Sequence, residues 1–440
     1  MMAREQKKEN KELTPEERLQ QALVPEEEWP YELPEGWKWV RIGGISELYN
    51  GRAFKPTDWS NEGLPIVRIQ NLNDREAEYN HYAGEVDEQY ALHGGELLFA
   101  WSGTPGTSFG AHIWWGKEAV LNQHIFKMEF DENLLNKRYF MHAINQQLNK
   151  LISVAHGGAG LQHVTKGVFE NTAIPLPDLA TQESLVSFID KQCARLDEVS
   201  EEIESVLDSS EKRKQSILYK AMTGDLSERW RKENGYSLEE WDRRSVNDIC
   251  RDIKVGIVIK PTRYYTDSSG IPAFRSANVR EFHVQDSDWV YINEQGQREN
   301  QRTIVHTNDV LIVRSGNPGT ACVVPEKFDG CNAIDIIIAV PDQSVIDPDY
   351  LCIFTNSPIG HGQIKSGVRG MALTHFNVTS YGKLEIAVPS LAEQHEIVHL
   401  VKQYLEKEKT VEETAMSVLN QLETTRQAIL NKAFRGELVC

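Results

Sequence analysis

Two clusters of arginine, amide and hydroxyl side chains are the groups in this sequence best suited to specific hydrogen bonding. An arginine fork can bind the two acceptors on a guanine edge, and an amide can bind adenine in the same two-point manner. Because the two clusters hold matching places in the two halves of the chain, base contact and an ordinary polar loop explain them equally well. In chain order the residues are Arg68, Gln70, Asn71, Asn73 and Arg75, then Arg275, Ser276, Asn278 and Arg280.

A glycine-rich loop also occurs twice. Ser-Gly-Thr-Pro-Gly-Thr starts at Ser102 and Ser-Gly-Asn-Pro-Gly-Thr starts at Ser315, each after an apolar run that predicts a strand. Glycine allows backbone amides to approach a phosphate closely, and a tight hairpin turn is an equally good explanation. The candidate contacts in these loops are Ser102, Thr104, Arg314, Ser315 and Asn317.

A third polar segment precedes the last predicted strand of each half. In the first half it holds Gln162, His163 and Lys166. We expect these segments to form a further contact loop, although capping or core packing explains the two histidines more simply. The matching residues of the second half are Lys365, Arg369 and His375.

The two halves are copies of one unit. From Leu161, which matches Leu373, the copies keep a constant separation of 212 residues. Pro-x-Leu-Ala-x-Gln begins at Pro177 and again at Pro389, and the similarity continues to the end of each copy. A repeat of this length indicates two equivalent domains, each followed by the same connecting element.

The connecting element reads as a long helix. In each copy, residues spaced alternately by three and four form an apolar seam with polar interruptions, including Ser210, Arg213 and Glu408. A proline precedes each helix, and Gly224 and Gly436 follow. About 43 residues at 1.5 Å each make a rod of roughly 65 Å. Each helix therefore has one apolar stripe, and we expect it to pack against the same stripe of the other copy.

The parts before the helices read as strands and loops with one short helix each, which indicates an α+β fold. The predicted helices cover residues 137–151 and 349–357. The predicted strands are 64–69, 96–101, 119–121, 125–129 and 174–176, with counterparts such as 310–314 and 334–340.

The composition limits the function classes. The net charge of −18 argues against a polycationic nucleic-acid binder, so contacts to phosphate need local patches or a more basic partner. The sequence has no signal peptide pattern and no apolar run long enough to cross a bilayer, so we expect a cytoplasmic protein without membrane contact. Six cysteines without paired spacing favour neither zinc nor a disulfide framework.

Catalytic motifs are missing from the sequence. It holds no GxxxxGK[ST] loop, no HExxH, no GxSxG and no GxGxxG before a helix. A DNA aminomethyltransferase would need an Asn/Asp-Pro-Pro-aromatic motif, and the chain has no Pro-Pro pair. We therefore expect no catalytic site, cofactor or metal in this chain. A self-contained methyltransferase or nuclease is the disfavoured alternative.

The chain resembles the specificity subunits of type I restriction-modification systems. The resemblance covers nearly all of it after the first thirty or so residues. It rests on Leu33 to Trp37, on the two Pro-x-Leu-Ala-x-Gln segments, on the helix exits that end at Leu226 and Leu438, and on the bridge that follows Leu226. In duplicate these segments are highly specific.

The resemblance implies two target recognition domains, each reading one half of a split asymmetric DNA site. An antiparallel coiled coil would set the gap. It also implies two methyltransferase subunits that bind S-adenosylmethionine and methylate adenine, and ATP-driven restriction subunits. Base contacts do not transfer from the family, because its specificity lies in variable domains.

The sequence thus predicts six segments, and one alternative remains. A protein-binding scaffold with duplicated domains on a coiled coil would also fit the acidic charge. The predicted segments are an acidic extension at 1–32, target recognition domains at 33–177 and 241–389, long helices at 178–226 and 390–438, and a linker at 227–240.

Overall fold

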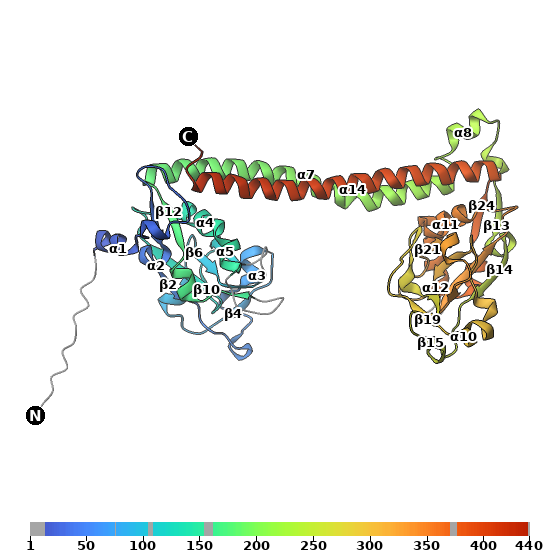
Figure 1. Cartoon of the computed structure of the whole chain (residues 1–440), viewed down its shortest axis with the longest axis horizontal. Coiled ribbons are helices and arrows are strands. Elements are labelled where there is room, and N and C mark those ends of the chain that lie inside the picture. The colour runs from blue at the N-terminus through green and yellow to red at the C-terminus, as the bar shows by residue number, and fades with distance from the viewer. Residues whose placement is uncertain (1–13, 75, 104–108, 154–161, 370–375, 439–440) are drawn as a thin grey trace, which may run out of the picture. The chain divides into compact units, whose positions relative to one another are not determined.

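The computed structural model describes residues 14–438 except 75, 104–108, 154–161 and 370–375. The chain divides into two compact units, which are considered separately. Unit 1 comprises Met1–Glu202 with Val418–Cys440, and unit 2 comprises Ile203–Ser417. Each unit contains one globular domain and portions of two long helices, α7 (Leu179–Thr223) and α14 (Leu391–Phe434). Domain 1 runs from β1 to β12, and domain 2 runs from β13 to β24 (Figure 1).

Domain 1 is built from two four-stranded sheets, with orders β2-β10-β6-β8 and β4-β3-β9-β5, and two short strand pairs, β1-β12 and β11-β7. The strands are β1 (Lys38–Arg41), β2 (Ser46–Asn50), β3 (Leu64–Val67), β4 (Asn80–Tyr82), β5 (Ala91–Leu92), β6 (Leu97–Ala100), β7 (Ser102–Gly103), β8 (Gly110–Ile113), β9 (Ala119–Leu121), β10 (Ile125–Phe130), β11 (Gln162–His163) and β12 (Ala173–Leu176). The helices before α7 are α1 (Pro15–Ala22), α2 (Ile42–Ile45), α3 (Ile69–Asn73), α4 (Lys137–Gln146), α5 (Leu148–Ser153) and α6 (Lys166–Glu170).

Domain 2 also has two four-stranded sheets, ordered β14-β23-β20-β21 and β15-β19-β16-β22, and its pair β13-β24 matches β1-β12; its other pair, β17-β18, is a local hairpin. Its strands are β13 (Asp242–Ser245), β14 (Cys250–Val255), β15 (Tyr265–Thr266), β16 (Ile271–Phe274), β17 (Val279–Arg280), β18 (His283–Val284), β19 (Val290–Ile292), β20 (Val310–Val313), β21 (Ala321–Val323), β22 (Asn332–Ala333), β23 (Ile336–Pro341) and β24 (Glu385–Val388). Helix α8 (Glu228–Glu233) precedes the domain, whose own helices are α9 (Val246–Ile249), α10 (Glu294–Glu299), α11 (Pro348–Asn356), α12 (Pro358–Arg369) and α13 (Val378–Gly382).

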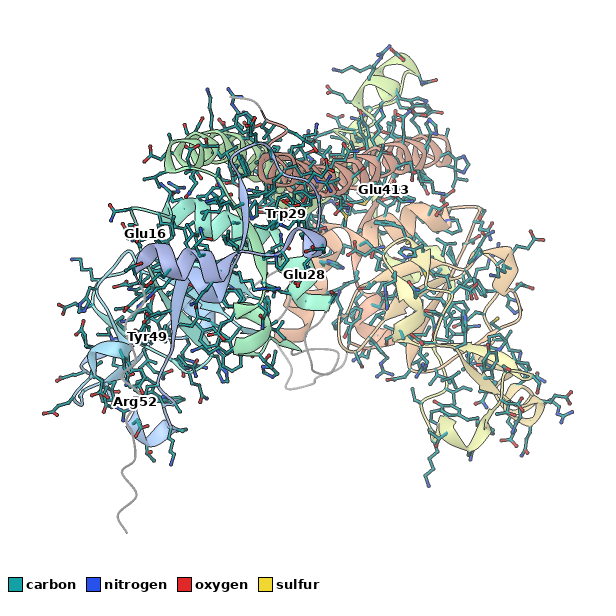
Figure 2. All side chains as sticks on the ribbon, turned by 60° about the vertical axis from the view of Figure 1, so that its left-hand side comes forward. Glu16, Glu28, Trp29, Tyr49, Arg52 and Glu413 are labelled. Atoms are coloured by element: carbon teal, nitrogen blue, oxygen red, sulfur yellow. The ribbon has the colours of Figure 1, made fainter. Side chains whose placement is uncertain are left out.

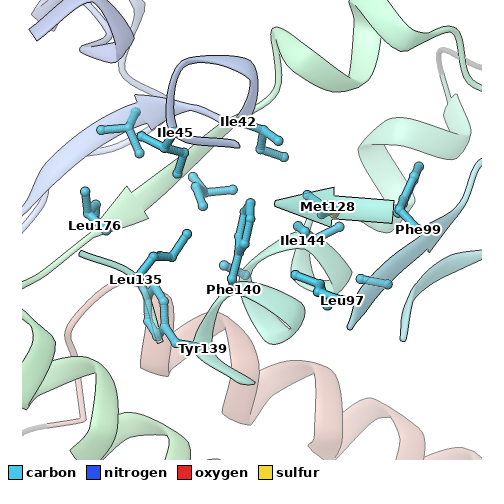
Figure 3. Packing of buried hydrophobic residues seen from close by; sticks show 14 of the residues in the cluster. Ile42, Ile45, Leu97, Phe99, Met128, Leu135, Tyr139, Phe140, Ile144 and Leu176 are labelled. Carbon is cyan, nitrogen blue, oxygen red and sulfur yellow. The ribbon is translucent and has the colours of Figure 1, made fainter. Parts of the chain in front are cut away.

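Each domain shares its core with both long helices. In domain 1 the core around Phe99, Tyr139 and Phe140 (Figure 3) includes Leu185 of α7 and Phe434 of α14. In unit 2 the equivalent cluster includes the end of α7 and the start of α14. Burial of these apolar side chains fixes each domain to the helices by the hydrophobic effect.

One glutamine in each copy fastens the start of the long helix to its domain. The Gln182 amide accepts the Asn136 N–H at 2.8 Å and donates to the carbonyls of Leu134 (3.1 Å) and Pro177 (2.9 Å). Gln182 is fully buried. The Pro-x-Leu-Ala-x-Gln motif is therefore a structural clasp.

The second copy has the same clasp. Gln394 accepts the Asp347 N–H at 2.8 Å and donates to the carbonyls of Val345 (3.0 Å) and Pro389 (2.9 Å). Gln394 is also fully buried. The repeated sequence motif thus produces a repeated set of hydrogen bonds.

The two long helices run antiparallel. In unit 2, Arg213 of α7 pairs with Glu408 of α14 at 2.9 Å, while Ser210 donates to Glu412. Both pairs involve residues that interrupt the apolar seam, so the polar positions match one another and favour one register. The predicted fold class, with two repeated α+β domains and an antiparallel coiled coil, is confirmed.

Some predicted boundaries differ from the structure. The predicted helix 137–151 is two helices, α4 and α5. The predicted strand 334–340 begins only at Ile336, because Asp335 has φ of 51°. Within the expected extension 1–32, a capping box at Thr14 starts α1, and Ala22 and Val24 are buried.

No described helix is long and apolar enough to cross a membrane. Within the described part of the chain, no group of three or more His, Cys, Asp or Glu side chains is arranged to hold a metal ion.

Candidate nucleic-acid interface

An asparagine shapes the loop that carries the first predicted cluster. Asn71 is fully buried, and its side-chain oxygen accepts the Arg68 N–H at 3.1 Å. Its amide nitrogen donates to the carbonyls of Ala77 (3.2 Å) and Glu78 (3.3 Å). The Asn71 amide therefore accepts one and donates two hydrogen bonds inside the loop, and these bonds hold the loop backbone in place.

Asn278 does the same work in domain 2. It is fully buried, accepts the Arg275 N–H at 3.0 Å, and donates to the carbonyls of Gln285 (3.4 Å) and Ser287 (2.8 Å). Both asparagines of the predicted clusters are thus buried and hydrogen-bonded within their loops, where they hold the loop backbone. Burial at this spot could not be read from the sequence, because a polar cluster in a loop has the same composition whether its amide points inward or outward.

The two arginines that begin these loops each make at least one side-chain contact within their domain. The Arg68 guanidinium donates to Asn80 Oδ1 at 2.9 Å and lies 6.0 Å from the Trp59 ring centre. The Arg275 guanidinium donates to the Asp288 carbonyl at 2.8 Å. Both arginines are half-buried. Each keeps further donors in a fixed fork, which suits planar recognition.

Three other members of the clusters are exposed. Gln70 and Asn73 face solvent on α3, and Arg280 faces solvent on β17, where it donates to the Ser276 carbonyl at 3.2 Å. Arg75 lies outside the described residues. Side chains that are exposed on a loop fixed by a buried asparagine suit contact with another molecule.

The second glycine-rich loop closes a hairpin between β20 and β21. The Gly319 N–H donates to the Val313 carbonyl at 3.0 Å, and the Thr320 hydroxyl donates to the Asn317 carbonyl at 3.2 Å. Gly316 and Gly319 have φ of 90° and 99°, a conformation that favours glycine. The turn interpretation thus holds for this copy, and it leaves Asn317 exposed at the tip.

In domain 1 the residues around the matching loop are less accessible. Ser102 is buried and pairs with His163 between β7 and β11. Thr104 lies outside the described residues. Gln162 belongs to β11. Ser102 therefore supports the base of the loop.

Trp101, directly before Ser102, forms an aromatic cluster with two histidines. Its ring centre lies 5.1 Å from that of His124 and 5.9 Å from that of His163. Burial, and then the nearby His163, lower the pKa of His124, so it is neutral at pH 7. Among the described residues, Nδ1 of each histidine is buried without a hydrogen-bond partner.

At the same place in domain 2 stands an ion pair. Arg314 directly precedes Ser315, and its Nη1 lies 3.0 Å from Asp335 Oδ1. The Arg314 side chain is 18% exposed, and that of Asp335 is 51% exposed. The two copies thus carry different chemistry at one backbone position.

The third predicted segment is only partly described. The Lys166 amine donates to the Leu48 carbonyl at 3.1 Å and lies 3.6 Å from Glu170, so it steadies α6 against β2. Lys365 is exposed on α12, the helix that ends at Arg369. His375 lies outside the described residues. Lys166 and Lys365 are both exposed, so both suit contact with another molecule.

Clefts bring some of the predicted residues together. Ser276, Arg280, Ser315 and Asn317 line one cleft of about 1040 Å³ in unit 2, to which α7, α11 and α14 also contribute residues. In unit 1 a small cavity of about 130 Å³ is lined by Arg68, Gln70 and His124, among others. Arg314 lies in a different cleft, of about 310 Å³, near Lys383. The structure therefore splits the predicted residues of domain 2 between two surfaces.

Residues 34–208 and 238–421 match a protein family described as "Type I restriction modification DNA specificity domain". The two matches together span most of the chain. The chain belongs to this DNA specificity family. Its two matched segments correspond to the two structural repeats.

Curated relatives and solved structures agree with the family. This specificity chain is 26% identical over 419 residues to the type I restriction enzyme EcoBI specificity subunit of Escherichia coli, covering 92% of this chain and 86% of that one. It is 25% identical to the EcoKI specificity subunit of Escherichia coli strain K12, covering 92% and 90%. A chain from a structure of a type I restriction-modification system has the same fold, with a TM-score of 0.72 and 19% identity over 93% of this chain and all of that one. The HsdS subunit from Thermoanaerobacter tengcongensis gives 0.56 and 19%, over 93% of this chain and 99% of that one.

Several residues that the structure places at these sites in this specificity chain were not identified from the sequence. Trp101 stands at the position of Arg314, so the repeat itself held the signal for it. Asp335 gave no signal, because its left-handed backbone conformation is not evident from an apolar run. Val258 and Ile259 were not singled out from the sequence, and their exposure becomes evident only in the structure.

Proposed function

We propose that this chain is the DNA-sequence-recognition subunit of a type I restriction-modification enzyme and has no catalytic role. Each domain reads one half of a split asymmetric site in double-stranded DNA. The observation that carries this proposal is the duplication of one scaffold with different side chains on its loops. Gln182 and Gln394 make the same bonds, whereas Trp101 and Arg314 differ completely.

A scaffold repeated in this way suits the reading of two different sequences. Buried asparagines fix the loops in both copies, so exposed side chains can differ without altering the backbone. The exposed groups Gln70 and Asn73 of domain 1, and Arg280 and Asn317 of domain 2, are of the types that contact base edges. Arg68, Arg275, Ser276, Ser315 and Lys365 complete the proposed DNA-facing set.

The long helices act as the spacer. In unit 2 the pairs Arg213–Glu408 and Lys214–Glu412, at 2.9 and 2.7 Å, match polar positions across the helices. In unit 1 Arg426 pairs with Asp197. A register set by paired polar residues keeps the length of the spacer constant, and a constant length gives a constant gap between half-sites.

The partners are two methyltransferase subunits, which bind S-adenosylmethionine and methylate adenine N6, and ATP-dependent restriction subunits. Large apolar side chains stand exposed along the helices, including Val199 (39%), Val411 (41%) and Met416 (60%), and a protein partner would cover them. With a net charge of −18, the chain also needs partners to supply part of the phosphate contact. The complex acts in the cytoplasm.

Co-expression of the chain with the methyltransferase subunit encoded beside it tests the function. Sequencing of N6-methyladenine across the host DNA is expected to yield one split motif with a fixed gap. A well-formed complex without motif-specific methylation would contradict the proposal and favour the protein-binding scaffold. Methylation by the chain without the subunit would instead identify an enzyme.

A further inference from the structure

An aliphatic tip projects from domain 2 after β14. Val258 is 49% exposed and Ile259 is 71% exposed, and no other large hydrophobic side chain in the described part of the chain is as exposed as Ile259. The matching residue of domain 1, Phe54, is half-buried, and its ring packs 5.2 Å from that of Tyr82. Beside it the guanidinium of Arg52, labelled in Figure 2, donates to the Tyr82 hydroxyl at 2.7 Å. In domain 1 the side chain at this position thus packs against Tyr82, whereas in domain 2 it is exposed.

The backbone holds the tip in a defined place. The Ile257 N–H donates to the Ala333 carbonyl at 2.7 Å, and the Asp335 N–H donates to the Ile257 carbonyl at 3.2 Å. A glycine is required just before the tip, because a Cβ on Gly256 would lie 2.5 Å from the Ala333 carbonyl oxygen. The tip then turns at Lys260, which has φ of 45°. These hydrogen bonds tie Ile257, two residues before Ile259, to the backbone of Asp335.

The Asp335 carboxylate is half-exposed, and the largely buried Arg314 holds it at 3.0 Å; the backbone N–H of Asp335 donates to the Ile257 carbonyl, at the start of the tip segment. A free carboxylate on a DNA-reading surface would be repelled by phosphates. Arg314 offsets this charge, so the pair is nearly neutral and suits a base edge better than the DNA backbone. Arg314 is the positioning residue, and Asp335 presents the acceptor.

We propose that Ile259 and Asp335 read adjacent base pairs in the major groove of the half-site bound by domain 2. Ile259 contacts the methyl group of a thymine, and Asp335 accepts a hydrogen bond from the N4 amino group of a cytosine. Both groups are presented in the major groove and neither in the minor groove, so an aliphatic side chain beside a neutralised carboxylate matches that groove. This inference rests on the proposed function and names the bases that one domain reads.

Uracil substitution tests the aliphatic contact without any change to the protein. The complex with the methyltransferase subunit is titrated with duplexes that carry its motif, in which deoxyuridine replaces one thymidine at a time. Exchange of the loop of domain 1 assigns the half-sites beforehand. We expect one position in the half-site of domain 2 to bind roughly fourfold more weakly with uracil, as befits the loss of one buried methyl group. Ile259→Ala should bind thymine and uracil at that position equally.

Leu238→Ala is the matched control for the tip. Leu238 is also apolar and 47% exposed in unit 2, but it lies in the linker before β13. This variant should keep the fourfold preference for thymine. If Ile259→Ala weakens binding of the methyltransferase subunit and leaves base preference unchanged, the tip docks a protein and the inference is overturned.

Asp335→Asn tests the polar contact. An asparagine can bind adenine at two points, because its side-chain amide nitrogen donates to N7 and its oxygen accepts from the N6 amino group. Selection from duplexes randomised in this half-site should therefore shift one position from cytosine to adenine by tenfold or more. Arg314→Ala should relax the same position and leave the neighbouring thymine preference intact, which a merely structural role would not produce.

The outcomes separate the inference from the proposed function. Absence of any split motif overturns both. Three results with a split motif would overturn the inference alone. The half-site of domain 2 could lack adjacent thymine and cytosine, uracil could leave binding unchanged, or Asp335→Asn could weaken binding equally for all sequences.

Discussion

Domain 1 and domain 2 have the same backbone at the base of their glycine-rich loops and carry unrelated side chains there. The Trp101 carbonyl accepts the Val164 N–H at 3.0 Å, and the Arg314 carbonyl accepts the Phe376 N–H at 3.2 Å. Outward from this shared bond, domain 1 has an aromatic cluster and domain 2 has an ion pair with Asp335. The chain conserves what positions its loops, and it varies what the loops present.

The same division extends to the junctions between domains and helices. In unit 2 the Glu393 carboxylate is 2% exposed and lies 2.7 Å from Arg231, 2.7 Å from the Ser227 hydroxyl and 3.0 Å from the Trp241 indole nitrogen. The matching residue of unit 1 is Thr181, which is half-buried and bonds Asp178. The linker therefore binds the start of α14 through the buried pair Arg231–Glu393, and the start of α7 has no equivalent charge pair among the described residues.

The largest effect is expected from breaking that charge pair. Arg231→Ala leaves the Glu393 carboxylate buried without its cation, which costs about 3–5 kcal/mol in the free energy of unfolding. Chemical denaturation monitored by hydrogen exchange should show the loss in unit 2. Thr181→Ala, the matched control in unit 1, should change stability by less than about 1 kcal/mol. Equal losses in the two variants would contradict the difference between the junctions.

An intermediate and equal effect is expected from the two glutamine clasps. Gln182→Ala and Gln394→Ala each leave the buried carbonyl and N–H partners of the glutamine unsatisfied, at a cost of about 1–3 kcal/mol. Because the bonds match in length and burial, the two losses should agree within about 0.5 kcal/mol when each variant is unfolded in denaturant. Clearly unequal losses in the free energy of unfolding would show that the same hydrogen-bond geometry does not contribute the same stability in the two units.

The smallest effect is expected in the dependence of stability on pH, and we expect unit 1 to lose stability at acidic pH more than unit 2. Burial lowers the pKa of His142 below its usual 6.5, despite Asp190 at 3.1 Å. The unfolded chain therefore takes up this proton first, so stability is complete above pH 6.5 and falls as the pH falls below it. The matching residue of unit 2 is Ile353, which is buried and apolar.

His142→Ile copies the residue of unit 2 into unit 1. Thermal unfolding between pH 7.5 and about pH 5.5 should show a smaller decrease in Tm for this variant than for the natural chain. Asp190 keeps Arg138 as a partner at 3.0 Å, so no unpaired carboxylate confuses the comparison. An unchanged pH slope would assign the acid sensitivity to another group, such as His124.

The long helices and the repeat could be predicted from the sequence, because they rest on periodic and duplicated patterns. A helix predicted at 178–226 forms at Leu179–Thr223, and the glycine after it has φ of 81°. The candidate site was harder. Asn71 belongs to the predicted cluster, but whether its amide points inward depends on carbonyls six and seven residues further along the chain. Asp335 was hidden because a single left-handed residue interrupts an otherwise apolar run.

The most direct test of the account compares the methylation patterns of two surface variants with that of the natural chain. Gln70→Ala/Asn73→Ala alters exposed amides of domain 1, and Ile259→Ala alters the exposed tip of domain 2. Each chain is co-expressed with the methyltransferase subunit, and N6-methyladenine is sequenced across the genome. The account predicts that each variant relaxes one half of the split motif, that the halves differ, and that the gap stays constant. A change in both halves from either variant, or a uniform loss over all sites, would contradict the claim that each domain reads its own half-site.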